Sequence, residues 1–304
     1  MDHEREGLSG LTSAGAWLGL LLGDSGLPTG GFVYSAGLEA AAHAGHVTPA
    51  ALHAHVAHAL AAHARLAAPY AAAAWAIVDA SPVCAALSLP PSSWAETLAA
   101  VRALDASCDA IVTSCAVARR ASRAQGLAFI ALVEKAFMAQ SDADTDGVHP
   151  RFAPLLAAFR KLIRAHLTPG HLPVAFGVIC RCLAIPIKTA QEILLFQFAR
   201  SQVSAAVRLN IIGPYAGQRL LLSLRVDTAN ALAAVQQHVD RLTDAEQEWW
   251  RDEEEEEDKE SNNGNNSTLL YLVKRAESQA CQISPVLDVL QGMHDQLYSR
   301  LFNS

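Results

Sequence analysis

One repeated spacing in the middle of the chain limits the fold more than any other feature. Apolar and small residues recur there at intervals of three and four: Val101, Leu104, Cys108, Ile111, Cys115 and Ala118. This spacing places side chains on one face of an α-helix. Alanine, the best intrinsic helix former, dominates the apolar residues, and β-branched residues are sparse by comparison. The sequence therefore predicts an all-α fold, a single orthogonal bundle of about ten helices.

Glycine, proline and polar runs divide the expected helices. We predict helices at 16–22, 32–45, 48–78, 93–138 with an interruption at Gly126, 152–166, 172–184, 188–209, 217–224 and 229–250, and further helix from 268 with a restart at 284. Residues 1–15 are expected to be a flexible N-terminal tail, and 16–304 one helical domain. Seven acids at 252–258 and the Asn-rich residues after them cannot bury apolar area, so 251–267 is expected to be a disordered insertion.

The charge and cysteine content exclude several classes of partner. With 23 basic and 30 acidic residues, the net charge of -7 equals the charge of the seven-acid run. The rest of the chain is balanced, which leaves no basic surface for nucleic acid. The apolar stretch at 16–22 is far shorter than the roughly 20 residues that cross a membrane. Six cysteines without a CxxC pair and an N-terminus unlike a targeting peptide predict a cytoplasmic protein with reduced thiols.

One short motif suggests an enzyme, but its context argues against it. Gly23-Asp24-Ser25-Gly26 matches the nucleophile motif of chymotrypsin-like serine proteases. In that family the histidine precedes the serine and the domain is β-rich, whereas this chain has neither property. Nucleotide-binding and zinc-protease motifs are also absent from the sequence. We therefore predict a binding protein that is not an enzyme, and the serine hydrolase remains an alternative.

Twelve histidines raise the question of a metal site. His55 and His58 are three residues apart, so they share a helix face and could bind one nickel or zinc ion. A histidine-decorated solvated face is the simpler interpretation. Cys108 and Cys115 are about 10.5 Å apart along a helix, too far for one ion, and are expected in the core with Cys180 and Cys182. We predict no metal site and no tightly bound cofactor, with a nickel metallochaperone using His55 and His58 as the alternative.

Four separated segments together resemble the UreF family of urease accessory proteins. The first follows the family pattern S-x-L-P-x-G-x-F-x-x-S-x-G-L-E from Ser25 to Glu39. The others are 120–126, 171–177 with 202–209 and 217–218, and the C-terminal residues 294–302. Their order and spacing agree over nearly the whole chain. An adaptor unrelated to urease is the remaining general alternative.

The resemblance implies a UreF-like bundle, a homodimer and no catalytic activity. It also implies that the chain binds UreD, called UreH in some organisms, and recruits the GTPase UreG. The assembly then transfers nickel to apo-urease, so nickel is present only in transit, through an internal tunnel. The acidic insertion departs from typical bacterial relatives and puts little of this in doubt.

A proline-glycine turn and the C-terminus are the predicted partner-binding segments. A rigid turn that presents an aromatic side chain suits an interface, as does a terminus that mixes aromatic residues with arginine. We expect the C-terminus to become ordered on UreD, and Arg300 with Phe32 to support UreG docking. Alternatively, Phe32 belongs to the core and the C-terminus packs on its own domain. Small residues at 204–206 suggest a dimer contact. The predicted partner-binding residues are Pro28, Gly30, Phe32, Glu39, His294, Tyr298, Ser299, Arg300, Leu301 and Phe302.

Overall fold

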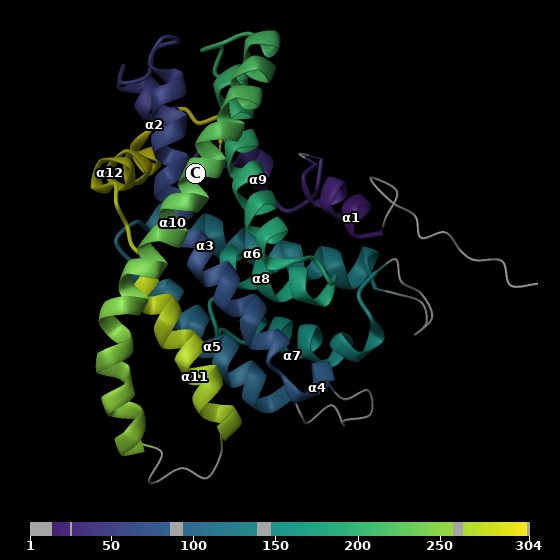
Figure 1. Cartoon of the computed structure of the whole chain (residues 1–304). Coiled ribbons are helices and arrows are strands. Elements are labelled where there is room, and N and C mark those ends of the chain that lie inside the picture. The colour runs from purple at the N-terminus through teal and green to yellow at the C-terminus, as the bar shows by residue number, and fades with distance from the viewer. Residues whose placement is uncertain (1–13, 25, 86–93, 139–146, 258–263, 303–304) are drawn as a thin grey trace, which may run out of the picture.

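The computed structural model describes residues 14–24, 26–85, 94–138, 147–257 and 264–302, and these form an all-α bundle (Figure 1). No strand occurs in these ranges, which confirms the predicted fold class. The twelve α-helices of the described residues are α1 Ala14–Leu22, α2 Leu38–His43, α3 Leu52–Asp79, α4 Pro82–Ala85, α5 Ala95–Ile111, α6 Ala116–Ala136, α7 Ala153–Arg164, α8 Leu172–Cys182, α9 Ile187–Arg208, α10 Pro214–Glu257, α11 Gly264–Gln279 and α12 Pro285–Met293. None of them combines the length and apolarity that a membrane-spanning helix requires.

The alanine-rich helix α3 is the centre of the bundle, and two hydrophobic clusters meet along it. Its first half packs against α9 and α10, in a cluster that also includes residues of α2 and α12, and its second half packs with α5, α8 and α11. Pro69 lies inside this helix and cannot donate the hydrogen bond that the carbonyl of Arg65 would normally accept. Cys281 N–H donates to that carbonyl instead, at 3.2 Å. The proline is therefore tolerated because the segment after α11 replaces the missing donor.

Two glycines allow neighbouring backbones to touch. A Cβ at Gly177 in α8 would collide with the carbonyl oxygen of Ala71 in α3, and a Cβ at Gly126 in α6 would collide with that of Gly170. The predicted interruption at Gly126 is wrong, because α6 continues through it to Ala136. The glycine is needed for close packing against the loop before α8 and does not end the helix.

The helical face predicted for residues 101–118 is divided between two helices. Val101, Leu104 and Cys108 are buried on α5, but that helix ends at Ile111, and Cys115 precedes α6. The break contains Val112-Thr113-Ser114, whose types are poor helix formers, and Thr113 Oγ1 donates to the carbonyl of Asp109 at 2.7 Å. Apolar periodicity alone did not reveal this turn.

Two other predictions of helix boundaries are wrong, one at 32–45 and one at 217–250. The expected helix at 32–45 is reduced to a 3-10 turn and α2, because Ala36 and Gly37 have left-handed φ angles of 46° and 86°. The expected helices at 217–224 and 229–250 are one helix, α10. No glycine or proline separates them.

The predicted disordered insertion at 251–267 is partly helical. Residues 251–257 continue α10, and 264–267 belong to α11, while 258–263 lie outside the described residues. Glutamate is a good helix former, so an acidic run can extend an existing helix. Most of the predicted N-terminal tail, 1–13, also lies outside the described residues, and α1 begins at Ala14.

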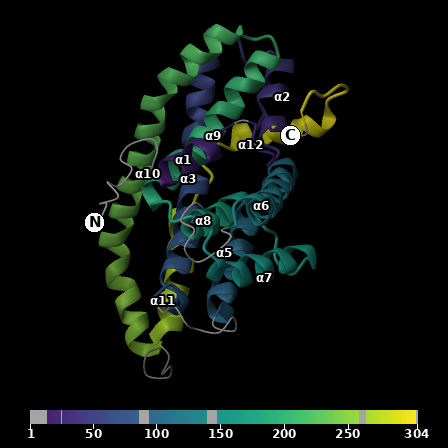
Figure 2. The same ribbon diagram turned by 90° about the vertical axis from the view of Figure 1, so that its right-hand side faces the viewer.

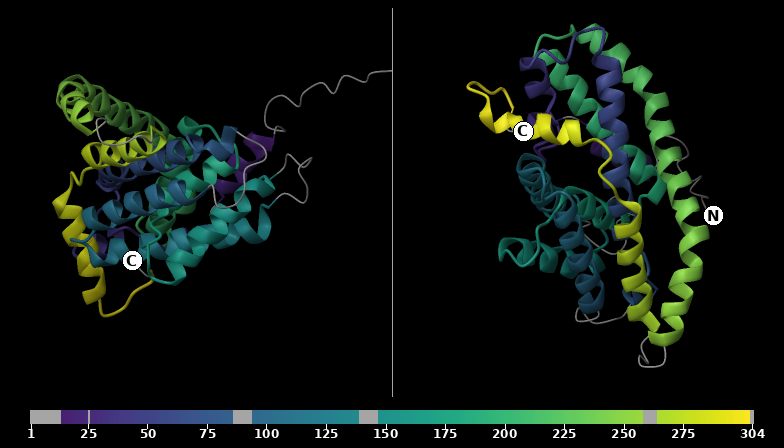
Figure 3. Two further views of the ribbon diagram at one scale, coloured as in Figure 1. Left: turned by 90° about the horizontal axis from the view of Figure 1, so that it is seen from below. Right: turned by 90° about the vertical axis from the view of Figure 1, so that its left-hand side faces the viewer.

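The C-terminal helix α12 lies beside α2 and one end of α6, on the side of the bundle away from α10 (Figure 2). Two further views show the same placement, with α10 and α11 forming an antiparallel hairpin at another edge (Figure 3). This arrangement brings α2, near the start of the chain, beside α12, near its end.

Candidate protein-docking site

The elbow, which we define as residues 26–34, connects α1 to α2. Gly30 has a φ of 82°, which glycine adopts without the Cβ penalty, and the 3-10 turn Gly31–Val33 follows it. Arg208, the last residue of α9, donates a 2.6 Å hydrogen bond to the carbonyl oxygen of Phe32. The Phe32 side chain is 52% exposed. Pro28 and Gly30 are also exposed, so the elbow presents surface and Phe32 is not a core residue.

Glu39, in the first turn of α2, is a buried acceptor for the tail, which we define as residues 294–302. Its Oε1 accepts from Leu301 N–H at 2.6 Å, and its Oε2 accepts from Phe302 N–H at 3.3 Å. Oε2 also lies 3.0 Å from His294 Nε2. Glu39 and His294 have no exposed surface, so they hold the tail in place. This differs from the direct partner contact predicted for both residues.

The tail is anchored at its end and exposed along its middle. Phe302 is 3% exposed and packs in the same cluster as parts of α9 and α10. Tyr298 is fully exposed, and Ser299, Arg300 and Leu301 are also exposed. The tail therefore follows a defined path along its own domain. That a partner orders it stays a prediction. Its last aromatic residue packs on its own domain.

Helix α12 extends the exposed surface of the tail. Val286, Val289 and Met293 are spaced by three and four residues, which places them on one helix face. All three are exposed, Val286 by 70% and Val289 by 63%. An exposed apolar helix face of this kind is typical of a protein interaction site.

An open groove of about 1080 Å³ separates the elbow from the tail. Arg120 pairs with Asp295 through bonds of 2.8 and 3.2 Å, and Arg300 reaches the same carboxylate at 3.3 Å. The hydrogen bonds from Arg120 hold the pKa of Asp295 below its usual value. Two guanidinium groups share one carboxylate, so this part of the rim is positively charged. Small residues of α6 line the groove: Ala121, Ala124 and Ala128.

A buried carboxylate fixes the loop that leads into α8. Asp105 in α5 accepts from Thr168 Oγ1 at 2.7 Å and from the N–H groups of Gly170 and His171 at 2.5 and 2.8 Å. Asp105 has no exposed surface. The start of α8 is therefore held by an acceptor on a distant helix.

A serine, a histidine and an aspartate also meet beside α8. His171 Nε2 lies 2.9 Å from Asp109 Oδ1, and its Nδ1 lies 3.1 Å from Ser122 Oγ. The bidentate pair with Arg119 lowers the pKa of Asp109 to about 2, and burial lowers the pKa of His171. Ser122 Oγ accepts the N–H of Leu172, the first residue of α8. The group thus links α5, α6 and α8 as a structural network. Ser25, the candidate nucleophile of the alternative serine hydrolase, lies outside the described residues.

The histidine pair proposed for metal does not gather further ligands. His58 Nε2 lies 2.8 Å from Ser284 Oγ, and His55 Nε2 is buried without a hydrogen-bond partner. Burial lowers the pKa of His55. Within the described residues, no three His, Cys, Asp or Glu side chains converge as they would around a metal ion. Cysteines 108, 115, 180 and 182 are buried, as predicted.

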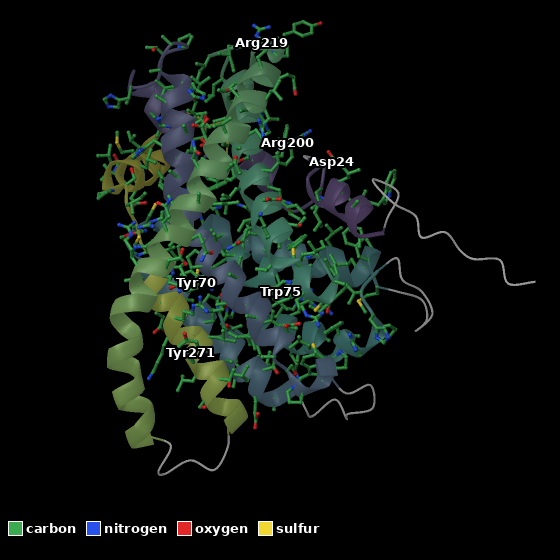
Figure 4. The ribbon with its side chains drawn as sticks, viewed as in Figure 1. Asp24, Tyr70, Trp75, Arg200, Arg219 and Tyr271 are labelled. Atoms are coloured by element: carbon green, nitrogen blue, oxygen red, sulfur yellow. The ribbon has the colours of Figure 1, made fainter. Side chains whose placement is uncertain are left out.

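His63 lies between two cavities and is not part of the histidine-decorated surface. Its ring stacks on Phe198, with centroids 4.1 Å apart and an interplanar angle of 8°. It lines one cavity under the elbow and another beside α12. Asp24 and Arg200, the latter in the C-terminal half of α9, line the first cavity, and Figure 4 labels them near each other. Burial lowers the pKa of His63 to about 4, so the ring is neutral at neutral pH.

The His63→Phe variant is expected to lose part of the acid sensitivity of the native fold. In the unfolded chain His63 has its ordinary pKa of 6.5, so the unfolded state binds more protons between pH 6.5 and about 4. The native state with its neutral His63 ring keeps its full unfolding free energy above pH 6.5. About 2–3 kcal/mol of that free energy is lost as the pH falls toward 4. Phenylalanine keeps the stacking on Phe198. Urea unfolding at pH 7 and pH 4.5 measures the difference, and equal pH dependence in both proteins would contradict it.

Comparison with known proteins identifies the family. Residues 46–225, more than half of the chain, match the UreF family model. Urease accessory protein F of Arabidopsis thaliana is 31% identical over 299 residues, which cover 98% of this chain and 96% of that protein. Urease accessory protein 6 of Cryptococcus neoformans var. grubii is 32% identical over 197 residues, 62% of this chain and 58% of that protein. UreF of Paenarthrobacter aurescens is 42% identical over 82 residues, 27% of this chain and 37% of that protein. The chain therefore belongs to the UreF family of urease accessory proteins.

Proposed function

We propose that this chain is a non-enzymatic scaffold that binds UreD and recruits UreG while nickel is delivered to apo-urease. The observation that carries the proposal is the exposed apolar face of α12 and the tail, which buried groups hold in place. Val286, Val289 and Tyr298 are exposed on it, and Glu39 fixes the tail behind them. A pre-positioned surface loses little conformational entropy on binding, which favours a docking role. We assign UreD to this face.

The positively charged rim of the groove is the proposed contact for UreG. Arg300 is exposed and shares Asp295 with Arg120, so an acidic side chain of a partner can join or replace this pairing. Gly30 lines the same groove from the elbow, and the exposed Phe32 lies two residues further along. Nickel is cargo in this proposal, and the chain needs no tightly bound cofactor of its own.

A homodimer is part of the proposal because the family resemblance implies it. The small residues predicted as its contact do not support that location, since Ala205 and Ala206 are buried inside the chain. A dimer contact therefore has to be made by exposed residues elsewhere on the bundle. Light scattering of the purified chain measures the oligomeric state directly.

Matched tyrosine variants test the UreD contact. Tyr298→Ala, in a co-expression of all three accessory proteins, is expected to weaken UreD binding about tenfold or more, the effect of removing an interface anchor. Tyr215→Ala is the control, because Tyr215 is also highly exposed but lies on α10. Pull-down with tagged UreD measures the loss. Undiminished recovery with Tyr298→Ala, or an equal loss with the control, would exclude this face.

A charge reversal tests the UreG contact in the same assay. Arg300→Glu is expected to retain UreD and lose UreG, with less nickel-dependent activation of urease. Arg219→Glu is the control, at an exposed arginine near the start of α10, which Figure 4 labels at the top of the molecule. Unchanged recovery of UreG with Arg300→Glu would reject the assignment.

A further inference from the structure

Arg208 touches both predicted partner-binding segments. Its guanidinium carbon lies 4.2 Å from the ring centroid of Phe32 in the elbow and 4.3 Å from that of Phe302 in the tail. The same guanidinium group donates to the carbonyl oxygen of Phe32 at 2.6 Å. One side chain at the end of α9 therefore joins two segments that lie at opposite ends of the chain.

The two rings differ in what holds them. Phe302 is buried, and Glu39 fixes the backbone beside it, so its position is set by the domain. Phe32 is about half exposed, and its ring and carbonyl oxygen both contact Arg208. Stacking of a guanidinium on an aromatic face is attractive and is strongest where water is excluded. Arg208 thus contacts a fixed ring of the tail and an exposed ring of the elbow at the same time.

We propose that Arg208 is a positioning residue that makes the elbow and the tail one recognition surface. Displacement of the tail removes the Phe302 ring from the guanidinium group, and the hold on Phe32 weakens. A partner that moves the tail therefore loosens the elbow, and a partner that grips the elbow stabilises the tail. The inference rests on the proposed function for the identity of the partners, but the coupling itself is a property of this chain.

Substitution of Arg208 by lysine tests the positioning role separately from the positive charge. Lysine keeps the positive charge, which is favourable at the C-terminal end of α9. It lacks the planar guanidinium group that stacks on two rings and donates to a carbonyl oxygen at the same time. Arg208→Lys is expected to preserve the fold and break the coupling.

Hydrogen exchange measured by mass spectrometry on the full chain tests the coupling without any partner. The N–H groups of Val33 and Tyr34 bond within the elbow turn and report its opening. Phe302→Leu keeps an apolar anchor but removes the ring, and it is expected to accelerate exchange in the elbow about three- to tenfold. In the Arg208→Lys background, elbow exchange is already fast, and Phe302→Leu adds no further acceleration. Exchange in α8 is the internal control for an intact fold.

The results separate this inference from the proposed function. Two results would overturn the role of Arg208. One is elbow exchange that Phe302→Leu does not change, and the other is an equal acceleration by Phe302→Leu in the native chain and in Arg208→Lys. If exchange follows the expected pattern but Arg208→Lys binds UreD and UreG as the native chain does, the coupling stands and the assignment of partners to this surface fails.

Discussion

The Asp105→Ala variant is expected to lose about 3–5 kcal/mol of unfolding free energy, a large part of the stability of a typical domain. Asp105 is completely buried and accepts from one hydroxyl and two backbone N–H groups in the loop before α8. Alanine leaves these donors without an acceptor in a site that excludes water, and each buried unsatisfied group costs about 1–3 kcal/mol. Urea unfolding followed by circular dichroism measures the loss.

A surface ion pair provides the comparison for this variant. Asp79 pairs with Arg181 at 2.6 Å, but its side chain is about half exposed. Asp79→Ala is therefore expected to cost less than about 1 kcal/mol. Asp105→Asn retains one carbonyl oxygen as an acceptor and should fall between the two alanine variants. A loss for Asp105→Ala no larger than that for Asp79→Ala would show that the loop before α8 does not depend on this carboxylate.

Helix content could be predicted from the sequence because alanine and apolar periodicity act locally. The positions of α3, α8 and α9 were predicted within a few residues. The errors arise where tertiary contacts decide the outcome. Gly126 was expected to end a helix by its low propensity, but contact with the Gly170 backbone explains it. At Ile111–Cys115, the apolar spacing continues across a turn, so periodicity could not locate the break.

The sequence indicated the two segments of the candidate site, but it did not indicate that they lie side by side. Sequence motifs identified the elbow and the tail, yet they gave no indication that Glu39 bonds to the backbone of Leu301 and Phe302. Backbone donors have no sequence signature. Arg208 and Arg120 lay within recognised segments, but their contacts with Phe302 and Asp295 depend on how distant helices pack. The available signal for these contacts was the position of each arginine, next to a helix end or inside a segment of small and apolar residues.

Glu39→Gln is expected to release the tail and with it the proposed docking surface. The buried carboxylate accepts from two backbone N–H groups and faces the buried His294. Glutamine has the same shape, but it offers one acceptor oxygen and places an NH₂ group against donors. Each backbone N–H group that is left without its acceptor in a buried site costs about 1–3 kcal/mol. We expect the cost to appear first as local opening of the tail, because the weakened hydrogen bonds are the ones that join α2 to Leu301 and Phe302.

Limited trypsin digestion measures this opening, because the bond after Arg300 lies next to the N–H that Glu39 accepts. Cleavage there is expected to accelerate about tenfold or more in Glu39→Gln, since each 1.4 kcal/mol of local stability changes the open population about tenfold. Glu192→Gln, at an exposed position on α9, is the matched control and should leave the rate unchanged. Recovery of UreD in pull-down should fall in parallel with the cleavage rate. If Glu39→Gln is cleaved no faster than the control, the tail is held by Phe302 packing alone and the carboxylate has no positioning role.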